Sequence, residues 1–382
     1  MWEILYNMMK YFIMYQFEIG GVESVFRELS KCYNKPIKLI TVTPHYNTSL
    51  IDSLPLNVEY IKHDNIPILR NLLWLFNHKA KALYILLALL ILPLFLRLRN
   101  SNVKIINFSD TLSSLFVTVL ATNKRHRYSW VHCRPQALWG SKMPKVYVRL
   151  LSLCKSIVCI CHDQKKELLS LFPILSKNNV EVIYNPIDLD RIVNMAQEPL
   201  PVIVEMPYIC MVSRIDERSK DFKTPIKAYA SLPKEIRDIY TLQIIGDGPD
   251  IDRVKEYIIE NKMEDYVKLR GRDINPYRWM YNADLFLFSS KNEGLGLVIL
   301  EALACGQMVI ATDCPIGPKE ILQSDMECGI LVPVGDVGQM RDAIIKIINP
   351  HFPRCKYQEN AVKRLRDFAH DAFKKQIDNI FN

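Results

Sequence analysis

Short apolar runs, rich in β-branched and aromatic residues, alternate with helical segments along almost the whole chain, and this pattern constrains the fold most. Such alternation is typical of parallel sheets whose two faces are covered by helices. The runs form two series on either side of a stretch that holds four prolines, Asn185–Pro207. The expected strands are Tyr11–Tyr15, Lys38–Val42, Lys104–Phe108, Arg127–Val131, Ser156–Cys161 and Val180–Tyr184, then Tyr208–Val212, Thr241–Ile245, Val267–Leu269, Leu285–Phe288, Met308–Ala311 and Gly329–Val332.

The length of the chain also indicates two domains, because 382 residues are too many for one ordinary core. We therefore predict an α/β fold of two Rossmann-like, doubly wound domains that face a central cleft. The proline-containing stretch reads as an interdomain linker, which places one domain at residues 1–200 and the other at 201–360. The final helical segment, about 360–382, can pack back on the first domain. Ligands of such sheets bind beyond the carboxyl ends of the strands.

The overall charge favours acidic partners, since the formal net charge is +8 and the pI is about 8.8. The sequence has neither zinc-finger spacing nor an aromatic RNA-binding signature, so we expect no nucleic acid partner. The N-terminal stretch is apolar but interrupted by Glu3, Asn7 and Lys10, without the basic region and cleavage site of a secretory signal. We therefore expect a cytoplasmic protein.

Ten cysteines occur without paired spacing. A metal cluster of Cys154, Cys159, Cys161 and His162 is one interpretation of the run around SIVCIC. A strand turns alternate side chains to opposite faces, and no distant partner pair is evident. We therefore favour reduced, buried cysteines.

The run Ala82–Leu96 is the one segment of the sequence that resembles a membrane segment. Its fifteen apolar residues fall short of the roughly 20 that span a bilayer, and Pro93 interrupts them. Basic residues flank it on both sides, at Lys79, Lys81, Arg97 and Arg99. We favour a buried core helix over a helix that lies in the interface of an anionic membrane, and a spanning helix is the third alternative.

The segment from Glu293 to Glu301, EGLGLVILE, carries the strongest functional signal. It follows an apolar strand, and its glycines, Gly294 and Gly296, let the backbone approach a ligand closely. A helix is expected to begin near Leu297, and its free amides and dipole suit a phosphate. The two glutamates can face one cleft, where one carboxylate binds sugar hydroxyls and the other a ribose diol. The structural alternative is a helix with one N-terminal acid and one surface acid.

The run SRIDERSK follows the strand Tyr208–Val212, so Arg214 and Lys220 come directly after its carboxyl end. A guanidinium and an ammonium at this position could neutralise a diphosphate as it leaves. Five residues separate Arg214 from Lys220, and an inserted loop could shift the lysine, which makes Lys223 its substitute candidate. The structural alternative is a solvated run of charges.

Two further segments suggest a site in the first domain. Gly20 and Gly21 form a tight turn between a strand and a helix that begins near Val22, which is a second helix start suited to an anion. A lone histidine near an apolar strand is more often structural, but His132 closes a predicted strand, and this position adds weight to a functional role.

The segment IIGDGPD holds Gly246–Asp250 but lacks the third glycine of a dinucleotide-binding fingerprint. We interpret it as a strand-to-helix turn that lines the cleft. Asp250 and Asp252 fall on a helix with the wrong facing for two ligands of one ion, so we expect no catalytic metal.

These elements, in this order, resemble the retaining glycosyltransferases of family 4, which have the GT-B fold. The resemblance covers nearly the whole chain and is strongest from Tyr208 to Val334. It is carried by GGVES, VHCRP, VIYNPID, SRIDERSKDF, IIGDGP, NEGLGLVILEALACGQMVIATDCPIGPKEIL and GILVPVGD. The two glutamates with seven residues between them are highly specific in that context, whereas each other motif is moderately specific alone. The basic run departs from the family in having Ser213 where a glycine is common.

The resemblance implies a role for each residue. Glu293 would hold hydroxyls of the donor sugar, Glu301 the nucleotide ribose, and Arg214 with Lys220 the diphosphate. The amides of Gly21, Gly294, Leu295, Gly296 and Leu297 would add phosphate and sugar contacts, His132 would lie near the reacting sugar, Arg272 near the base, and Glu320 near the donor.

The implied reaction transfers a hexose or N-acetylhexosamine from a nucleotide-sugar, with a UDP-sugar favoured over GDP-mannose, and retains configuration without cofactor or metal. The acceptor would be a glycan or a lipid-linked molecule in cell-surface polysaccharide, lipopolysaccharide or capsule biosynthesis. Two alternatives stay open: a sugar-nucleotide epimerase on the same fold, and a non-catalytic, membrane-associated member of a glycan-assembly complex.

Overall fold

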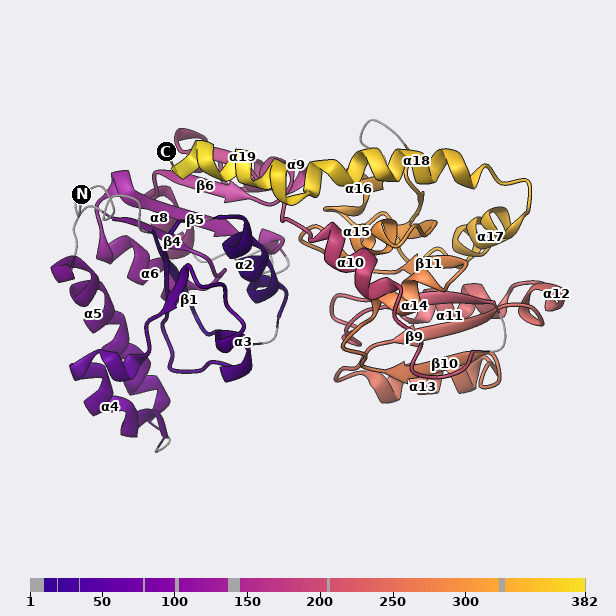
Figure 1. Ribbon diagram of the computed structural model, residues 1–382, viewed down its shortest axis with the longest axis horizontal. Coiled ribbons are helices and arrows are strands. Elements are labelled where there is room, and N and C mark those ends of the chain that lie inside the picture. The colour runs from indigo at the N-terminus through magenta and orange to yellow at the C-terminus, as the bar shows by residue number, and fades with distance from the viewer. Residues whose placement is uncertain are drawn as a thin grey trace. The chain divides into compact units, whose positions relative to one another are not determined.

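The computed structural model describes residues 10–381 except 19, 34, 78–79, 100–102, 137–144, 205–206 and 323–326. The chain divides into two compact units, shown by colour along the chain in Figure 1. Unit 1 extends to Pro186 and includes the C-terminal residues from Phe373 on, and unit 2 is Ile187–Ala372.

The boundary between the units lies at Pro186, earlier than the expected position near residue 200. The stretch Asn185–Pro207 is not all linker, because it contains helix α10 (Leu189–Ala196). Asp188 caps this helix by accepting a hydrogen bond from the backbone N–H of Arg191. The helix packs against α14 (Tyr277–Tyr281) and α15 (Leu297–Ala304), which makes it part of unit 2. The prolines lie on its flanks, where they do not interrupt it.

Unit 1 contains a parallel sheet of seven strands in the order β3-β2-β1-β4-β5-β6-β7. The six expected strands are present within a residue or two of their expected starts, and β3 is an addition. β3 is a three-residue edge strand that carries a glutamate, so it has no apolar run to mark it. The strands are β1 (Lys10–Met14), β2 (Ile37–Thr41), β3 (Val58–Tyr60), β4 (Lys104–Asn107), β5 (Arg127–Val131), β6 (Ser156–Cys159) and β7 (Asn179–Val182).

Helices on both faces of this sheet supply the rest of unit 1 (Figure 1). They are α2 (Gly21–Cys32), α3 (Thr48–Asp52), α4 (Pro67–Asn77), α5 (Lys81–Arg99), α6 (Leu112–Ala121), α8 (Lys145–Ser152) and α9 (His162–Leu171). Phe12, Phe26 and Phe108 are fully buried in the core of this unit. These three phenylalanines meet edge to face, with ring centroids 5.3 to 5.7 Å apart.

Unit 2 contains a parallel sheet of six strands in the order β10-β9-β8-β11-β12-β13, and all six were expected. The strands are β8 (Tyr208–Val212), β9 (Thr241–Ile245), β10 (Val267–Gly271), β11 (Leu285–Phe288), β12 (Val309–Thr312) and β13 (Ile330–Val332). Besides α10, α14 and α15, the helices are α11 (Lys223–Ala230), α12 (Lys234–Arg237), α13 (Ile251–Glu260), α16 (Pro318–Leu322), α17 (Val337–Ile348) and α18 (Arg354–Leu365), and α19 (His370–Phe381) begins here and ends in unit 1.

Helix α5 is longer than the apolar run that predicted it, and it is long and apolar enough to cross a membrane by length and composition. Every fourth residue on one face, Tyr84, Ala88, Leu92 and Leu96, is buried against α4 and α6. The expected core helix is therefore present, but only 28% of the apolar window Lys81–Leu98 is buried.

All ten cysteines are free thiols, and eight of them are buried. Burial raises the pKa of the Cys154 and Cys159 thiols to about 12. Among the residues that the structure describes, these thiols do not belong to a group whose ligand atoms lie close enough to hold one metal ion. The Cys161 sulfur accepts a hydrogen bond from the backbone N–H of Gln164 and so caps α9. The three thiols therefore have structural explanations.

Candidate active site

Both sheets reverse their strand order at one point, and the carboxyl ends of the strands there are the expected place for a ligand. In unit 2 the reversal lies between β8 and β11. Lys220 follows β8 and Glu293 follows β11, and the Lys220 ammonium donates a hydrogen bond to the Glu293 carboxylate. Ser290 donates a second hydrogen bond to that carboxylate at 2.7 Å. The loop geometry thus brings together two residues that lie 73 positions apart in the sequence.

Of the two candidate lysines, Lys220 is the one beside Glu293. Its ammonium lies 5.3 Å from the centroid of the Phe288 ring and donates to Ser290 at 3.2 Å. Lys223 instead begins α11, and its ammonium lies over the ring of Tyr257 at 5.5 Å. The five residues between Arg214 and Lys220 therefore do not carry the lysine away from the end of β11.

The glycine loop ends where it was expected to end, because Leu297 is the first residue of α15. Gly296 is the N-cap with φ +91°, a left-handed conformation that glycine adopts without strain. Since glycine has no side chain, no side-chain cap competes with a ligand for the N–H groups of the first turn, of which that of Ile299 donates to the Gly296 carbonyl at 2.9 Å. The side chain of Leu295 is buried, and Gly294 separates Leu295 from Glu293 in the sequence of the loop.

Glu301 lies one turn inside α15 and is partly buried. Burial raises the pKa of this carboxyl. A hydrogen bond from the Tyr277 hydroxyl at 3.2 Å and the positive charge of Arg191 lower the pKa, but by less. A desolvated carboxylate with one neutral donor retains acceptor capacity for the hydroxyls of a ligand. Tyr277 comes from α14, so its contact could not be expected from the spacing of the glutamates.

Arg214 is exposed, with 69% of its side chain accessible, and stands 3.9 Å from the Asp216 carboxylate. Asp216 is committed mainly to Arg218, whose guanidinium donates to both of its oxygens and lowers the pKa of that carboxyl to about 2. The Arg214 guanidinium therefore remains accessible for an anion beyond the end of β8.

The loop that carries Arg214 is packed against the turn after β9. At Gly246, where φ is +153°, a Cβ atom would stand 1.9 Å from the carbonyl oxygen of Ser213, so only glycine fits. Ile215 N–H donates to the carbonyl of Asp247 at 3.0 Å. The turn expected from IIGDGPD thus supports the position of Arg214.

The two remaining unit 2 candidates lie at other strand ends. Arg272 is exposed directly after β10, the edge strand of the sheet. Glu320 is buried on α16, and its backbone carbonyl accepts from the Arg364 guanidinium at 2.8 Å. A cavity of about 670 Å³ opens beyond β12 and β13, where Lys291, Asp313 and Lys319 are among its lining residues.

In unit 1 the strand order reverses between β1 and β4. Gly20 and Gly21 follow β1, and α2 begins at Gly21 with no side-chain cap, close to the expected start at Val22. His132 follows β5, the strand next to β4. Each candidate in this unit therefore lies at or beside the reversal.

His132 is 6% exposed, and neither of its ring nitrogens has a hydrogen-bond partner among the residues that the structure describes. Its ring packs on Phe108 with centroids 4.4 Å apart, and burial lowers the pKa of the imidazole to about 3. A buried polar side chain without partners is rare, and a bound ligand is one way to satisfy it. This observation favours the functional interpretation of His132 over the structural one.

Asp110 is a candidate that the sequence patterns did not identify. It follows β4, and its carboxylate accepts the backbone N–H groups of His132, at 3.0 Å, and of Cys133, at 2.8 Å. Burial raises the pKa of Asp110 to about 6, although these two hydrogen bonds by themselves lower it. The carboxylate therefore holds the backbone of His132 in place. An aspartate directly after a predicted strand was the sequence signal that could have identified Asp110. Its contact with His132 could not be predicted from local sequence, because the two residues are 22 positions apart.

A further cavity in unit 1, of about 440 Å³, opens between the loop after β2 and helices α4 and α5. His45, Tyr46 and Phe76 line it with aromatic rings, and Lys81 adds a positive charge. The His45 and Phe76 rings meet edge to face at 5.6 Å. Aromatic faces beside a cation are suited to a polar ligand with apolar ring faces, such as a sugar.

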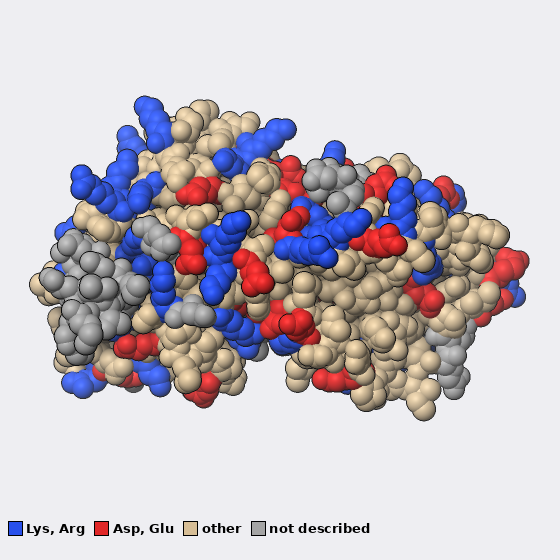
Figure 2. Space-filling model, turned by 45° about the horizontal axis from the view of Figure 1, so that its top comes forward, with Lys and Arg blue, Asp and Glu red and all other residues tan. Residues whose placement is uncertain are grey.

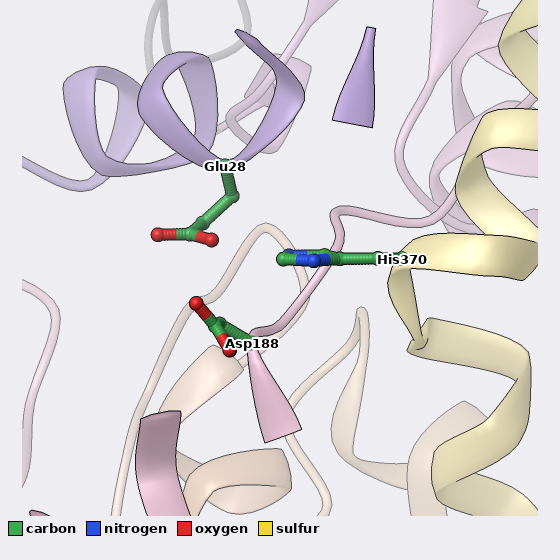
Figure 3. A group of neighbouring side chains, drawn as sticks. All are labelled: Glu28, Asp188 and His370. Atoms are coloured by element: carbon green, nitrogen blue, oxygen red, sulfur yellow. The ribbon is translucent and has the colours of Figure 1, made fainter. Parts of the chain in front are cut away.

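Figure 3 draws Glu28, Asp188 and His370, three residues of types that bind metals. Glu28 belongs to α2 of unit 1, and its carboxylate pairs with Lys31 at 2.9 Å. Asp188 and His370 belong to unit 2, where Asp188 already caps α10. Because each carboxylate has a partner within its own unit, we assign no metal to this group.

Comparison with known proteins adds the family. The model of Glycosyltransferase Family 4 matches residues 19–191, and that of Glycosyl transferases group 1 matches residues 196–364. The chain is 33% identical over 205 residues to the N-acetylgalactosamine-N,N'-diacetylbacillosaminyl-diphospho-undecaprenol 4-alpha-N-acetylgalactosaminyltransferase of Campylobacter jejuni, covering 52% of this chain and 54% of that protein. It is 30% identical over 189 residues to the lipopolysaccharide core biosynthesis glycosyltransferase LpsE of Rhizobium meliloti, covering 50% and 53%. The chain thus spans about half the length of these relatives.

Solved structures show the fold over the full length. The Anabaena protein HepE, crystallised in complex with UDP and glucose, has a TM-score of 0.73 at 17% identity and covers 98% of this chain and 99% of its own. The lipopolysaccharide outer core galactosyltransferase WaaB has a TM-score of 0.70 at 17% identity and covers 97% and 98%. With a matching family model in each half and two doubly wound units of the GT-B type, the chain belongs to the family 4, or group 1, glycosyltransferases.

Proposed function

We propose that this protein transfers a sugar from a nucleotide-sugar, with retention of configuration, to a glycan or lipid-linked acceptor in polysaccharide or lipopolysaccharide biosynthesis. The observation that carries the proposal is the contact of Lys220 with Glu293 at the strand reversal of unit 2. An ammonium and a carboxylate side by side suit the two groups joined by the bond that breaks. The ammonium matches the diphosphate, which gains negative charge, and the carboxylate matches the sugar, which gains positive charge.

The proposed mechanism assigns the departing diphosphate to Lys220, Arg214 and the backbone amides at the start of α15. Preorganised donors of this kind stabilise developing negative charge by several kcal/mol in a water-poor site. Glu293 accepts hydrogen bonds from hydroxyls of the donor sugar, and Glu301 from the ribose. The acceptor hydroxyl then attacks the oxocarbenium-like carbon from the face that the diphosphate leaves, and its proton passes to an oxygen of the departing diphosphate. Attack from that face retains configuration. Because two basic side chains supply the positive charge, we also propose that the reaction requires no metal or cofactor.

Two lines support the proposed substrates. The HepE structure was solved with UDP and glucose, which favours a UDP-sugar as the donor of this chain. The Campylobacter jejuni relative carries an undecaprenol diphosphate acceptor in its name, which favours a lipid-linked acceptor and an N-acetylhexosamine donor. The aromatic cavity of unit 1 supports an acceptor site in that unit.

The proposal is tested by nucleotide release from a panel of UDP-, GDP- and ADP-sugars, with lipid-linked diphosphate acceptors. We expect Glu293→Gln to lower kcat/KM at least about a hundredfold, or about 2.7 kcal/mol, because the amide loses the charge and one acceptor site. Glu264→Gln, which changes an exposed acid of the same unit, should leave the rate unchanged. Equal turnover by the Glu293→Gln variant and the wild type would refute the catalytic assignment.

The same assay separates the alternatives. A wild-type protein that isomerises the donor with no acceptor present is an epimerase, and one that neither releases nor binds any nucleotide is a non-catalytic partner. Addition of EDTA should not change the wild-type rate, and a loss of activity that Mg²⁺ or Mn²⁺ restores would contradict a metal-free reaction.

A further inference from the structure

Helix α5 carries a row of exposed leucines opposite its buried face. Leu83, Leu86, Leu90 and Leu94 are 47 to 59% exposed, and Leu98 is 79% exposed. Their spacing of three and four residues places them along one side of the helix. We call these five residues the leucine ridge. A surface helix normally turns polar side chains to water, and a continuous apolar stripe marks an interaction surface.

The neighbouring helix extends the apolar surface. Figure 1 shows α4 and α5 side by side at the periphery of unit 1, and the two helices pack against each other. Ile68 and Trp74 of α4 are each 58% exposed. An exposed tryptophan is typical of the boundary between water and lipid headgroups.

The charged residues of α4 and α5 themselves are of one sign. No acidic residue occurs between Asp64 and Asp110, whereas Arg70, Lys81 and Arg97 are exposed in that interval. Lys81 is the first residue of α5, and Arg97 lies in its last turn. The ridge thus has a cation near each end, which suits headgroups of opposite charge.

The asymmetry extends to the whole of unit 1. It holds 25 of the 49 Lys and Arg residues but 12 of the 41 Asp and Glu residues, a formal net charge of +13, which leaves −5 for unit 2. On the face seen in Figure 2, Lys and Arg are frequent on the left part, which holds unit 1. Long-range attraction to an anionic surface therefore acts on unit 1.

We propose that the leucine ridge docks this protein on an anionic lipid bilayer, with α5 lying in the interface. The leucines enter the boundary of the acyl chains, while Lys81 and Arg97 contact lipid phosphates. A spanning orientation would pull Tyr84, Ala88 and Leu92 out of the core of unit 1, where all three are fully buried. A second copy of the chain is a poor occupant, because it would bring two strongly basic units together.

The test is flotation of the purified full chain with vesicles of phosphatidylcholine, with and without phosphatidylglycerol. We expect binding to the anionic vesicles only. The triple variant Leu86→Ser, Leu90→Ser, Leu94→Ser should bind at least a hundredfold more weakly, since it removes apolar area from the interface. The matched control Leu56→Ser, which changes a fully exposed leucine of unit 1 outside its helices, should bind as the wild type does.

A second variant tests the charges separately. Lys81→Gln with Arg97→Gln should lower the affinity for anionic vesicles about tenfold or more, and added salt should reduce that difference. Because all of these side chains are exposed, the thermal unfolding of each variant should match the wild type, which excludes misfolding as the cause of weak binding.

Three results would overturn the proposal. The first is equal binding by the wild type and the triple variant, and the second is a wild-type dimer that the triple variant converts to a monomer without any vesicle binding. The third is retention of the protein in cell membranes after alkaline carbonate extraction, which would indicate a spanning helix. The readout is lipid binding, so it is independent of whether the proposed sugar transfer is correct.

Discussion

At the scale of single residues, burial shifts two neighbouring groups of unit 1 in opposite directions. It lowers the pKa of His132 to about 3 and raises that of Asp110 to about 6. The imidazole is therefore neutral throughout the physiological range, so it can donate one hydrogen bond and accept another but does not bring a positive charge to a ligand. Asp110 reaches the backbone of His132 and not its ring, which leaves both ring nitrogens to a ligand.

The shift of His132 predicts a pH dependence of stability. An unfolded His132 takes up a proton below its ordinary pKa of 6.5, whereas the folded one does so only near pH 3, so the free energy of unfolding falls as the pH falls between these values. Between about pH 7.5 and about pH 5.5, His132→Gln should lose about 1.4 kcal/mol less stability than the wild type. Urea unfolding at each pH measures the difference. Asp110 contributes with the opposite sign, since its raised pKa stabilises the fold at low pH and this stabilisation is lost as the pH rises through about 6, but it is present in both proteins. Parallel pH profiles would contradict the prediction.

At the scale of secondary-structure elements, α15 begins directly after Gly296 and α2 begins at Gly21, but the two glycines differ in what their backbone requires. Gly296 needs its positive φ to turn the chain from β11 into α15. Gly21 has no such requirement, and a Cβ atom there would meet nothing within 4 Å. One glycine is therefore required by the backbone conformation and the other is replaceable.

This difference predicts opposite effects of the same substitution. Gly296→Ala should lower the free energy of unfolding by roughly 1–2 kcal/mol, because alanine is strained in the left-handed region. Gly21→Ala should raise it by about 0.5 kcal/mol, because alanine restricts the unfolded chain at no cost to the fold. Denaturant unfolding of the two variants measures both values. A Gly296→Ala variant as stable as the wild type would contradict the assigned conformation.

At the scale of the whole molecule, the chain combines two similar folds with opposite net charges. Unit 1 carries the positive charge and the leucine ridge, and unit 2 carries the residues assigned to the nucleotide. This division suits a transferase whose acceptor is held at an anionic surface while its donor comes from solution. If the donor binds through the unit 2 residues as proposed, a nucleotide acts mainly on the stability of that unit.

Calorimetry with and without UDP should therefore show one transition that moves and one that does not. At a nucleotide concentration of about 100 times the dissociation constant, unit 2 gains about 2.7 kcal/mol, which raises its Tm by roughly 5–10 °C. Lys220→Met should reduce this shift at the same concentration, and Lys223→Met should not. A shift confined to the transition of unit 1 would contradict the assignment of the nucleotide to unit 2.

Much of the fold could be predicted because strands buried on both faces must be apolar throughout, and twelve such runs are visible in the sequence. β3 was missed because an edge strand needs no such run. Helix α10 was predicted to be linker because the prolines on its flanks indicated irregular structure, although Asp188 is a residue type that caps helices. By contrast, the start of α15 could be located from the sequence around Gly296, because the role of this glycine follows from local backbone geometry.

Local patterns were enough to predict the two parallel sheets, the glycine turns before α2 and α15, and the residue types at the ends of the strands, since each depends on interactions between near neighbours in the chain. The tertiary structure was needed to show that Lys220 and not Lys223 meets Glu293, that Tyr277 contacts Glu301, and that Asp110 positions His132. It also decided which side of α5 is buried, because a helix that is apolar all round has no periodicity to show which leucines face the core and which face outward. Contacts between distant segments depend on how the strands are ordered in the sheet, and that order is not contained in any local pattern.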